Sequence, residues 1–327
     1  MNRRRHVLWT LTGAAAAASL PSGASAQAAY PNKPIRMIIP FPPGGSTDIV
    51  GRLLASRLST PLGQSVVVEN RGGAGGTIGA AEIARATPDG YTLGIATVST
   101  CGTAPNIYPK LPYDPVKDYS AITNIAAVPG IIVVHPSFPA KNFADFIKVV
   151  KANPGKYNYA SSGAGGVGHM GMELFKIQSG TFVTHIGYRG AGPALTDVLA
   201  GNVPIMWDNL SSSLPYVKTG KLIAIGLAYD KRIPQLPDVP TFFELGMKDY
   251  DAATWFGVVA PRGTPKDIVA RVHDESVKII NSEDFKARLL DSGAFPIGDS
   301  PEHFTQTIAK EGGKWQKVAE FAKVKPE

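Results

Sequence analysis

Residues 35–48 read Ile-Arg-Met-Ile-Ile-Pro-Phe-Pro-Pro-Gly-Gly-Ser-Thr-Asp, an apolar run that leads into a turn rich in proline and glycine. The run from Ile35 to Phe41 predicts a buried strand, because it is short and is followed directly by turn-forming residues. A helix follows the turn and has its apolar residues at helical spacing, at Val50, Leu53, Leu54 and Leu58. The order strand, glycine turn, helix predicts an α/β fold with a largely parallel sheet.

The same alternation continues outward from this unit. In the first part of the chain we expect strands at 65–68 and 91–98, and between them a helix that follows the glycine-rich residues 72–76. A second block contains expected strands at 157–161, 182–188, 203–207 and 222–227, and expected helices at 143–150, 166–179 and 193–200. A strand at 255–260 and helices starting at Thr264-Pro265 and Ser300-Pro301 complete the chain.

The chain crosses between these blocks twice. Residues 120–136 form one long extended segment, and the second crossing lies near residue 250, after the proline-rich residues 232–240. A length of 327 residues with 44% hydrophobic residues is enough for two lobes, each with its own core. We expect a first domain made of residues 27–130 and 252–327 and a second domain made of residues 131–251.

The first 26 residues have the pattern of a secretory signal peptide. Arg3, Arg4 and Arg5 precede an alanine-rich apolar stretch, and Ala24-Ser25-Ala26 is a small-residue cleavage signal. The apolar stretch is too short for a membrane span, which needs about 20 strongly apolar residues. The mature protein is therefore expected in the periplasm, cleaved near Ala26 and not embedded in the membrane, with Sec and twin-arginine export both open.

Charge and cysteine content narrow the function further. The chain has 33 basic and 26 acidic residues, a net charge of +7, which falls to +4 when the three leader arginines are removed. No basic, aromatic-rich surface is evident, which argues against a nucleic-acid partner. The single cysteine, Cys101, excludes an intrachain disulfide and any multi-thiolate metal site, and the histidines have no metal-ligand spacing.

Two glycine-rich turns are candidate anion sites. Gly163-Ala164-Gly165-Gly166-Val167-Gly168 and Pro42-Pro43-Gly44-Gly45-Ser46 each connect an expected strand to an expected helix. Unpaired N–H groups and the positive end of the helix dipole favour an anion at such a turn. Ser46 is expected to cap its own helix, and Asp48 to hold the loop rather than contact the anion.

The second turn also fits the dinucleotide fingerprint G-x-G-x-x-G. The carboxylate that the fingerprint requires about twenty residues later is absent, because Tyr188-Arg189 occupies that place. An arginine there can accept the 2′-phosphate of NADP, so NADP remains an alternative ligand. No Gly-x-Ser-x-Gly or His-Glu-x-x-His motif is present. His169 either lines the site or is an interior imidazole, and Trp255 either covers the ligand or packs in the core.

Seven short motifs follow one another along the mature chain. They are Tyr30-Pro31-x-Lys33-Pro34-Ile35, Pro40-Phe41-Pro42-Pro43-Gly44-Gly45-x-x-Asp48, Val68-Glu69-Asn70-Arg71-x-Gly73, Pro88-Asp89-Gly90-Tyr91-Thr92, Tyr159-Ala160-Ser161-Ser162-Gly163, Tyr188-Arg189-Gly190 and Trp255-Phe256-Gly257. In this order they resemble the Bug (TctC-like) family of extracytoplasmic solute receptors, and the resemblance covers essentially all of the mature chain. It implies a type II periplasmic binding protein fold, with two α/β lobes, a hinge and a central ligand cleft.

The resemblance also implies which residues bind the ligand. They are Phe41, Pro42, Gly44, Gly45, Ser46 and Asp48 in the first loop, Thr97 and Ser99 at a strand end, Ser161, Ser162, Gly163, Gly166 and His169 in the opposite loop, and Tyr188, Arg189, Asp208 and Trp255. Arg189 departs from the common family pattern, so we expect it to help select the ligand, with a second carboxylate as the natural partner.

The predicted function is therefore capture of a small carboxylate, without catalysis, cofactor or metal. The resemblance implies a di- or tricarboxylate, an amino acid or an aromatic acid as ligand, and the membrane permease of a tripartite tricarboxylate transporter as partner. Two alternatives remain open at this point: a receptor that signals the bound solute to a sensor kinase, and an exported NADP-dependent oxidoreductase.

Overall fold

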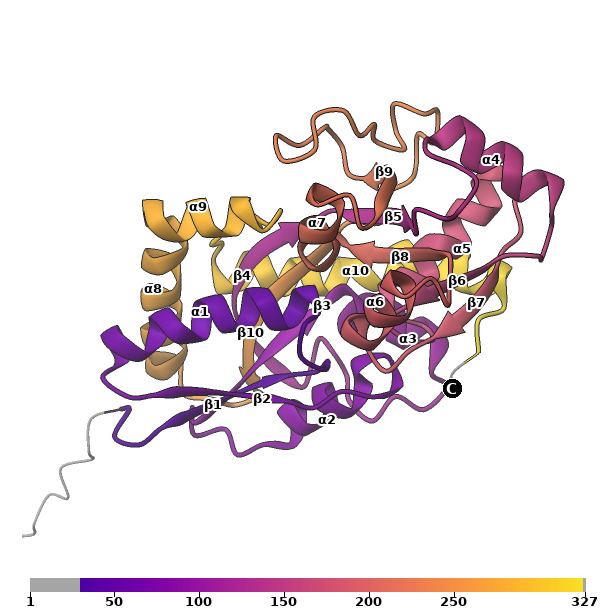
Figure 1. Cartoon of the computed structure of the whole chain (residues 1–327). Helices are drawn as coiled ribbons and strands as arrows, with labels where there is room; N and C mark the ends of the chain where they lie inside the picture. Colours follow the sequence, from indigo (N-terminus) through magenta and orange to yellow (C-terminus); the bar gives the residue numbers. More distant parts are fainter. Residues whose placement is uncertain (1–29, 326–327) are drawn as a thin grey trace, which may run out of the picture.

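Two mixed β-sheets with helices around them form the protein (Figure 1). The computed structural model describes residues 30–325, so the expected signal peptide lies outside the described residues. Sheet A has the order β11-β4-β10-β3-β1-β2, and sheet B has the order β7-β6-β8-β5-β9. We call sheet A with its helices lobe A, and sheet B with its helices lobe B.

The strands of sheet A are β1 (Ile35–Ile39), β2 (Val66–Asn70), β3 (Thr92–Thr97), β4 (Tyr119–Val128), β10 (Thr254–Pro261) and β11 (Phe295–Pro296). Those of sheet B are β5 (Gly130–Val134), β6 (Asn158–Ser161), β7 (Thr184–Gly187), β8 (Ile205–Asn209) and β9 (Ile223–Ala228). The expected strands therefore all exist, with ends that differ by one to a few residues.

The sheets are less parallel than expected. Strand β1 pairs in parallel with β2 and β3, and β6 pairs in parallel with β7 and β8. The strands next to the crossings are antiparallel, because β10 opposes β3 and β4, and β5 opposes β8 and β9. A strand that the chain enters directly from the other sheet, without a crossover helix, can run antiparallel to its neighbours.

The first crossing is a single residue. Pro129 separates β4 of sheet A from β5 of sheet B, and its carbonyl accepts the N–H of Leu210 at 2.9 Å. The second crossing lies between the end of β9 at Ala228 and the start of β10 at Thr254. Both crossings fall close to the expected positions, while the domain boundaries themselves stay a prediction.

The helices cover the faces of the two sheets (Figure 1). Lobe A carries α1 (Ser46–Leu62), α2 (Thr77–Arg85), α3 (Ala104–Ile107), α8 (Lys266–Asn281), α9 (Glu283–Asp291) and α10 (Pro301–Ala322). Lobe B carries α4 (Phe143–Ala152), α5 (Val167–Ser179), α6 (Ala191–Leu199) and α7 (Leu210–Lys218). A π-helical turn, Ser99–Thr103, follows β3 and runs into α3. Figure 1 shows α10, in yellow, passing behind both lobes.

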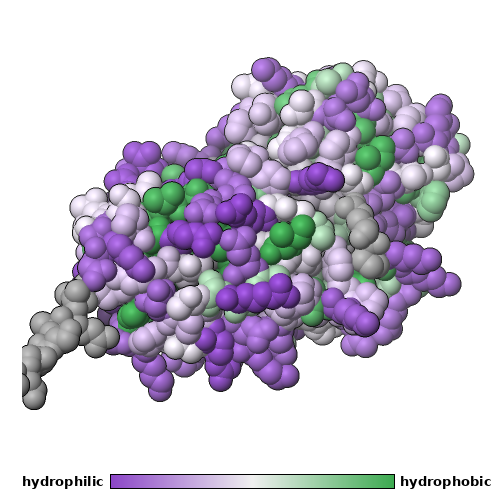
Figure 2. Space-filling model, turned by 90° about the horizontal axis from the view of Figure 1, so that it is seen from below, coloured by the Kyte–Doolittle hydropathy of each residue, from purple (hydrophilic) through white to green (hydrophobic). Residues whose placement is uncertain are grey.

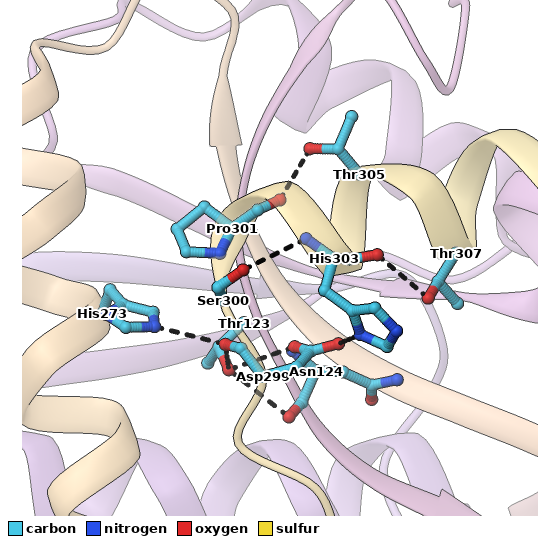
Figure 3. Close-up of polar contacts among 9 residues, drawn as sticks. All are labelled: Thr123, Asn124, His273, Asp299, Ser300, Pro301, His303, Thr305 and Thr307. Carbon is cyan, nitrogen blue, oxygen red and sulfur yellow. Dashed lines mark hydrogen bonds and ion pairs between the residues drawn. The ribbon is translucent and has the colours of Figure 1, made fainter.

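The start of α10 is fixed by a polar cluster that joins it to β4 and α8 (Figure 3). Ser300 caps the helix as expected, since its Oγ accepts the N–H of His303 at 3.2 Å. The Asp299 carboxylate accepts the N–H of Asn124 on β4 at 2.7 Å and contacts His303 Nδ1 at 2.9 Å. His273 of α8 reaches the Asp299 carbonyl at 3.2 Å, so one aspartate ties three elements together.

One local expectation needs correction. The start of α8 is not capped by Thr264, whose hydroxyl donates to the Pro261 carbonyl at 2.8 Å, and Pro265 takes the N-cap position instead. The structure also adds a helix that was not expected, α7, which follows β8 directly and contains Pro215.

The surface seen from the α2 side mixes hydrophilic and apolar groups (Figure 2), with the apolar residues in small separate groups. Among the described residues, no helix has the length and apolar character that a membrane span requires. Most large apolar side chains are inside, and Trp207 and Trp315 are fully buried, while a few, such as Phe321, are exposed.

Candidate functional site

A small cavity lies where the two lobes meet. Residues of lobe A and lobe B line it together: Phe41, Gly45, Ser46, Thr47, Thr97, Ser99, Ser162, Ala191, Asn209, Thr254 and Phe256. The volume open to the centre of a water molecule is about 10 Å³, which is room for about one water. The lobes are therefore closed on one another in this structure, and a ligand can enter only when they move apart.

Helix N-termini from both lobes meet at this cavity. Gly45 is the N-cap of α1, Ser46 and Thr47 are its first two residues, and Ala191 is the first residue of α6. Ser162 precedes the start of α5, and Asn209 is the N-cap of α7. Each such terminus presents N–H groups and the positive end of a helix dipole, so together they favour a negative charge between the lobes.

The cavity has no charged wall. Within the described residues, all the side chains that line it are neutral. An anion held here is therefore neutralised by main-chain dipoles and hydroxyl groups, not by an ion pair.

Ser46 connects the lobes at one end of the cavity. It does not cap α1, because Gly45 is the N-cap and Ser46 already lies inside the helix. The Ser46 hydroxyl instead reaches α7 of lobe B, where its oxygen accepts the N–H of Ser212 at 3.0 Å and it donates to the Asn209 carbonyl at 3.1 Å. A side chain of lobe A thus caps a helix of lobe B.

Ser99 makes the same kind of contact with α5. Its Oγ accepts the N–H of Val167, the first residue of α5, at 3.0 Å. Thr103, in the same π-helical turn, donates to the Gly165 carbonyl at 2.6 Å. Two helices of lobe B therefore have their N-termini completed by hydroxyl groups of lobe A in the closed form.

Asp48 holds the first loop, as expected. Its carboxylate accepts the N–H of Gly44 at 3.1 Å, the Asn70 amide at 2.8 Å and the Arg52 guanidinium at 2.7 Å. The amide of Asn70 also donates to the Phe41 carbonyl at 2.8 Å. The loop from Phe41 to Asp48 is therefore held from behind, and Asp48 does not line the cavity.

Asp208 is a buried support for α7. Both Ser212, at 2.7 Å, and Ser213 donate a hydroxyl hydrogen bond to its Oδ2. Burial raises the pKa of Asp208 to about 6, although these hydrogen bonds favour the charged form. Asp208 therefore positions Ser212, whose hydroxyl oxygen lies 2.9 Å from that of Ser46 in the other lobe.

His169 is an interior imidazole that supports the second loop. Its Nδ1 accepts the N–H of Gly165 at 3.1 Å, and its ring stacks on His185 with the centroids 3.7 Å apart. His185 Nε2 lies 2.7 Å from the hydroxyl of Ser161, the last residue of β6 before this loop. Burial lowers the pKa of His169 to about 4 and that of His185 to about 3, so both rings are neutral at pH 7.

The glycine fingerprint is explained by close packing. A Cβ at Gly165 would lie 3.0 Å from the side chain of Ile107, and one at Gly163 would lie 3.2 Å from the Tyr188 carbonyl. Gly168 faces the ring of Trp207 at 3.2 Å in the same way. These glycines let α5 approach its neighbours, which removes the need for a pyrophosphate to account for them.

Three predicted site residues lie away from the cavity. Trp255 points to the opposite face of β10 from Thr254 and Phe256, because side chains alternate along a strand. There it packs on Phe304 and donates to Glu311 at 2.9 Å. Arg189 is exposed, and the hydroxyl of Tyr188 donates to Asp197 at 2.6 Å.

The predicted residues that line the cavity are Phe41, Gly45, Ser46, Thr97, Ser99 and Ser162, while Pro42, Gly44, Ser161, Gly163 and Gly166 lie in the same two loops without lining it. The lining residues that the sequence reasoning missed are Thr47, Ala191, Asn209, Thr254 and Phe256. Asn209 had a usable signal, since an asparagine after a strand and before a serine run favours a helix start.

Comparison with known proteins agrees with this geometry. Residues 50–323 match the family described as the tripartite tricarboxylate transporter family receptor, TctC. The chain belongs to this family. It is also 35% identical to the protein BugT of Bordetella pertussis over 290 residues, which are 88% of this chain and 89% of BugT.

Solved structures extend the comparison to the fold of this TctC-family receptor. A periplasmic transporter protein is 47% identical, with a TM-score of 0.89, covering 91% of this chain and 99% of that one. Rpa4515 of R. palustris, solved with adipate, is 36% identical, with a TM-score of 0.88, covering 91% of this chain and 100% of its own. MatC of Rhodopseudomonas palustris, solved with bound malate, is 33% identical, with a TM-score of 0.84, covering 88% and 99%.

The comparisons confirm the predicted fold and class of function. The chain is a TctC-family solute-binding receptor with the two-lobed periplasmic binding protein fold. It is not an enzyme, and the alternative of an NADP-dependent oxidoreductase is set aside.

Proposed function

We propose that this receptor captures a small carboxylate in the cavity between its lobes and delivers it to the membrane permease of a tripartite tricarboxylate transporter. The observation that carries the proposal is the meeting of helix N-termini from both lobes at one cavity whose described wall has no charged side chain. A carboxylate is the small anion whose two oxygens suit N–H and hydroxyl donors arriving from opposite sides.

Closure provides the coupling between binding and conformation. Contacts from α1 and from the helix starts of lobe B reach the same ligand only when the lobes are together, so the ligand favours the closed form. The Ser46 and Ser99 bonds to α7 and α5 add to closure at the two ends of the cavity. The ligand-bound receptor then has a closed shape, which a permease can distinguish from the empty, open receptor.

Two relatives support the choice of ligand class. Rpa4515 was solved with adipate and MatC with malate, and both share more than 30% of their residues with this chain over most of its length. Both ligands are dicarboxylates. We therefore place dicarboxylates first among the candidates for this receptor, ahead of aromatic acids.

We also propose that the protein works in the periplasm after cleavage near Ala26. The signal-peptide pattern of residues 1–26 and the periplasmic origin given for related structures support this location. The domains proposed at 27–130 with 252–327 and at 131–251 place one crossing at Pro129 and the other between β9 and β10.

Isothermal titration calorimetry of the mature protein against a series of mono-, di- and tricarboxylates tests the proposal. We expect stoichiometric binding of at least one acid, with a Kd of about 1 μM or tighter. Failure of the whole series to bind would contradict the proposed function.

A matched pair of variants isolates the charge of the site. Gly45 is the N-cap of α1, a position where asparagine and aspartate are both good caps. Gly45→Asp adds a negative charge to the cavity wall, whereas Gly45→Asn adds a side chain of the same size without charge. We expect Gly45→Asp to bind the acid at least about tenfold more weakly than Gly45→Asn.

A further inference from the structure

Two buried polar atoms in the cavity wall have no hydrogen-bond partner. Among the described residues, they are Oγ1 of Thr254 and Oδ1 of Asn209. Thr254 begins β10 directly after the second crossing, and its side chain is only 2% exposed. Asn209 ends β8, paired with Gly130 directly after the first crossing. Both residues therefore belong to the part of the cavity next to the crossings.

Such atoms are uncommon in folded proteins, because a buried polar group without a partner loses its hydration and gains nothing in return. The side chain of Asn209 is not needed to hold its own segment. The hydroxyl of Ser46 donates to the carbonyl of Asn209 at 3.1 Å, and this fixes the main chain. The amide is consequently available for a different partner.

The two atoms differ in chemistry. Oδ1 of Asn209 is an acceptor, so its partner has to donate a hydrogen. A carboxylate has no hydrogen to donate. The hydroxyl of Thr254 both donates and accepts, and a group that donates to Asn209 while it accepts from Thr254 satisfies both atoms. An alcohol has this combination of one donor and free lone pairs.

The neutral wall decides between a hydroxyl and an ammonium group. An ammonium also donates, but it carries a full positive charge, and the described cavity lining contains no carboxylate to pair with it. Moving such a charge from water to a site between the positive ends of several helix dipoles is unfavourable. A neutral hydroxyl meets no such penalty.

We propose that Asn209 and Thr254 recognise a hydroxyl group on the ligand, so that the receptor selects 2-hydroxy carboxylates over the analogues that lack the hydroxyl. This inference rests on the proposed function, because the carboxylate at the helix N-termini brings the hydroxyl into the same cavity. The helix starts then bind the acid group, and the two residues near the crossings distinguish one acid from another.

The test is calorimetry with two matched pairs of acids, malate against succinate and lactate against propionate. We expect the hydroxy acid of at least one pair to bind at least about tenfold more tightly than its partner, because the deoxy acid leaves both buried atoms unpaired. In Asn209→Leu and Thr254→Val, this ratio should fall to within about twofold. Thr254→Ser keeps the hydroxyl and should keep the preference.

The outcomes separate this inference from the proposed function. Equal affinity for both members of each pair, with binding intact, overturns hydroxyl recognition and leaves carboxylate capture standing. Loss of affinity for hydroxy and deoxy acids alike in the variants, at an unchanged melting temperature, also overturns it. If Thr254→Val does not fold, the ratio in Asn209→Leu decides the matter, since that side chain lies at the end of a strand and its amide oxygen makes no bond to the fold. If no carboxylate binds the unmodified receptor, both proposals fail.

Discussion

The hydroxyl oxygens of Ser46 and Ser212 lie 2.9 Å apart, although the first belongs to α1 of lobe A and the second to α7 of lobe B. The N–H of Ser212 also donates to Ser46 Oγ, so one serine completes the N-terminus of a helix in the other lobe. Closure of the lobes thus exchanges a water-exposed helix end for a capped one. This contribution exists only in the closed form.

Ser46→Ala should therefore weaken ligand binding more than it weakens the fold. A lost cap costs about 1 kcal/mol, which corresponds to about a fivefold weaker affinity for the best acid of the calorimetric series. The control is Ser56→Ala in the same helix, where the hydroxyl donates only to the Leu53 carbonyl on the exposed face. Calorimetry should find a change in the first variant and none in the second; equal effects would contradict a cross-lobe role.

The stacked pair His169 and His185 predicts acid sensitivity. The pKa of His169 falls to about 4 and that of His185 to about 3, mainly because burial disfavours the charged rings. The unfolded rings titrate near 6.5, so the stabilisation is present above pH 6.5 and is lost as the pH falls toward 4 and then 3. The fold should lose several kcal/mol over this range by urea titration.

His185→Gln tests this assignment. A glutamine amide can replace His185 Nε2 beside the Ser161 hydroxyl, which lies 2.7 Å away, but takes up no proton in this range. The free energy of unfolding of the variant should depend less steeply on pH between 6.5 and 4 than that of the wild type. An unchanged slope would show that the pair does not govern acid stability.

Asp208 has the opposite pH dependence. Burial raises its pKa to about 6 from an ordinary value of 3.8, so the folded protein holds the proton more tightly than the unfolded chain. The corresponding stability is fully present below pH 3.8 and is lost as the pH rises through 6, with a size on the order of 3 kcal/mol. Asp208→Asn keeps an oxygen for Ser212 and Ser213 and should remove this loss. The histidine pair acts in the opposite direction between these pH values, so the Asp208 contribution partly offsets the acid destabilisation of the wild type. Urea titrations at pH 4 and pH 7 should therefore show a larger drop in stability at pH 4 for the variant than for the wild type.

The alternation of strands and helices was predictable because each is read from local apolar spacing. The first strand, expected from Ile35 to Phe41, forms from Ile35 to Ile39, and α1 begins at Ser46 directly after the glycine turn. The expected anion turns also lie at the cavity. Their positions follow from strand ends, which the sequence marks with glycine and proline.

What the sequence did not reveal depends on contacts between distant segments. Ser46 has the right place in the chain to cap α1, and only the approach of lobe B shows that it caps α7 instead. Trp255 sits between Thr254 and Phe256, so a single step along β10 decides which side chain faces the cavity. His185 had no local signal, because its role comes from stacking on His169 and not from its neighbours in the chain.

Arg189 should have little effect on binding. Its side chain is exposed and does not line the cavity, contrary to the expectation that it pairs with a second carboxylate. We expect Arg189→Ala to keep the affinity for dicarboxylates such as malate and succinate within about twofold, since an exposed charge at this distance is screened by salt. An affinity that is about tenfold or more weaker in calorimetry would show that Arg189 does contact the ligand.

Gly192 offers a way to block closure without harming the fold. It lies inside α6, where alanine is the better helix former by about 1 kcal/mol. A Cβ at this position would lie 2.6 Å from the main-chain carbonyl of Pro43 in the opposite lobe, a distance that only closure creates. Gly192→Ala should therefore keep or raise the melting temperature of the ligand-free protein while weakening the affinity for the best acid by at least about tenfold.

Gly313→Ala is the matched control for this substitution. Gly313 is an exposed residue inside α10, and a Cβ there meets no atom within 4 Å. It should raise the melting temperature through the same helix preference and leave the affinity unchanged. Small-angle X-ray scattering with saturating acid should then show a compact Gly313→Ala protein and a more open Gly192→Ala protein. Equal compaction of both variants would mean that α6 and the Pro43 turn do not come together when the ligand binds.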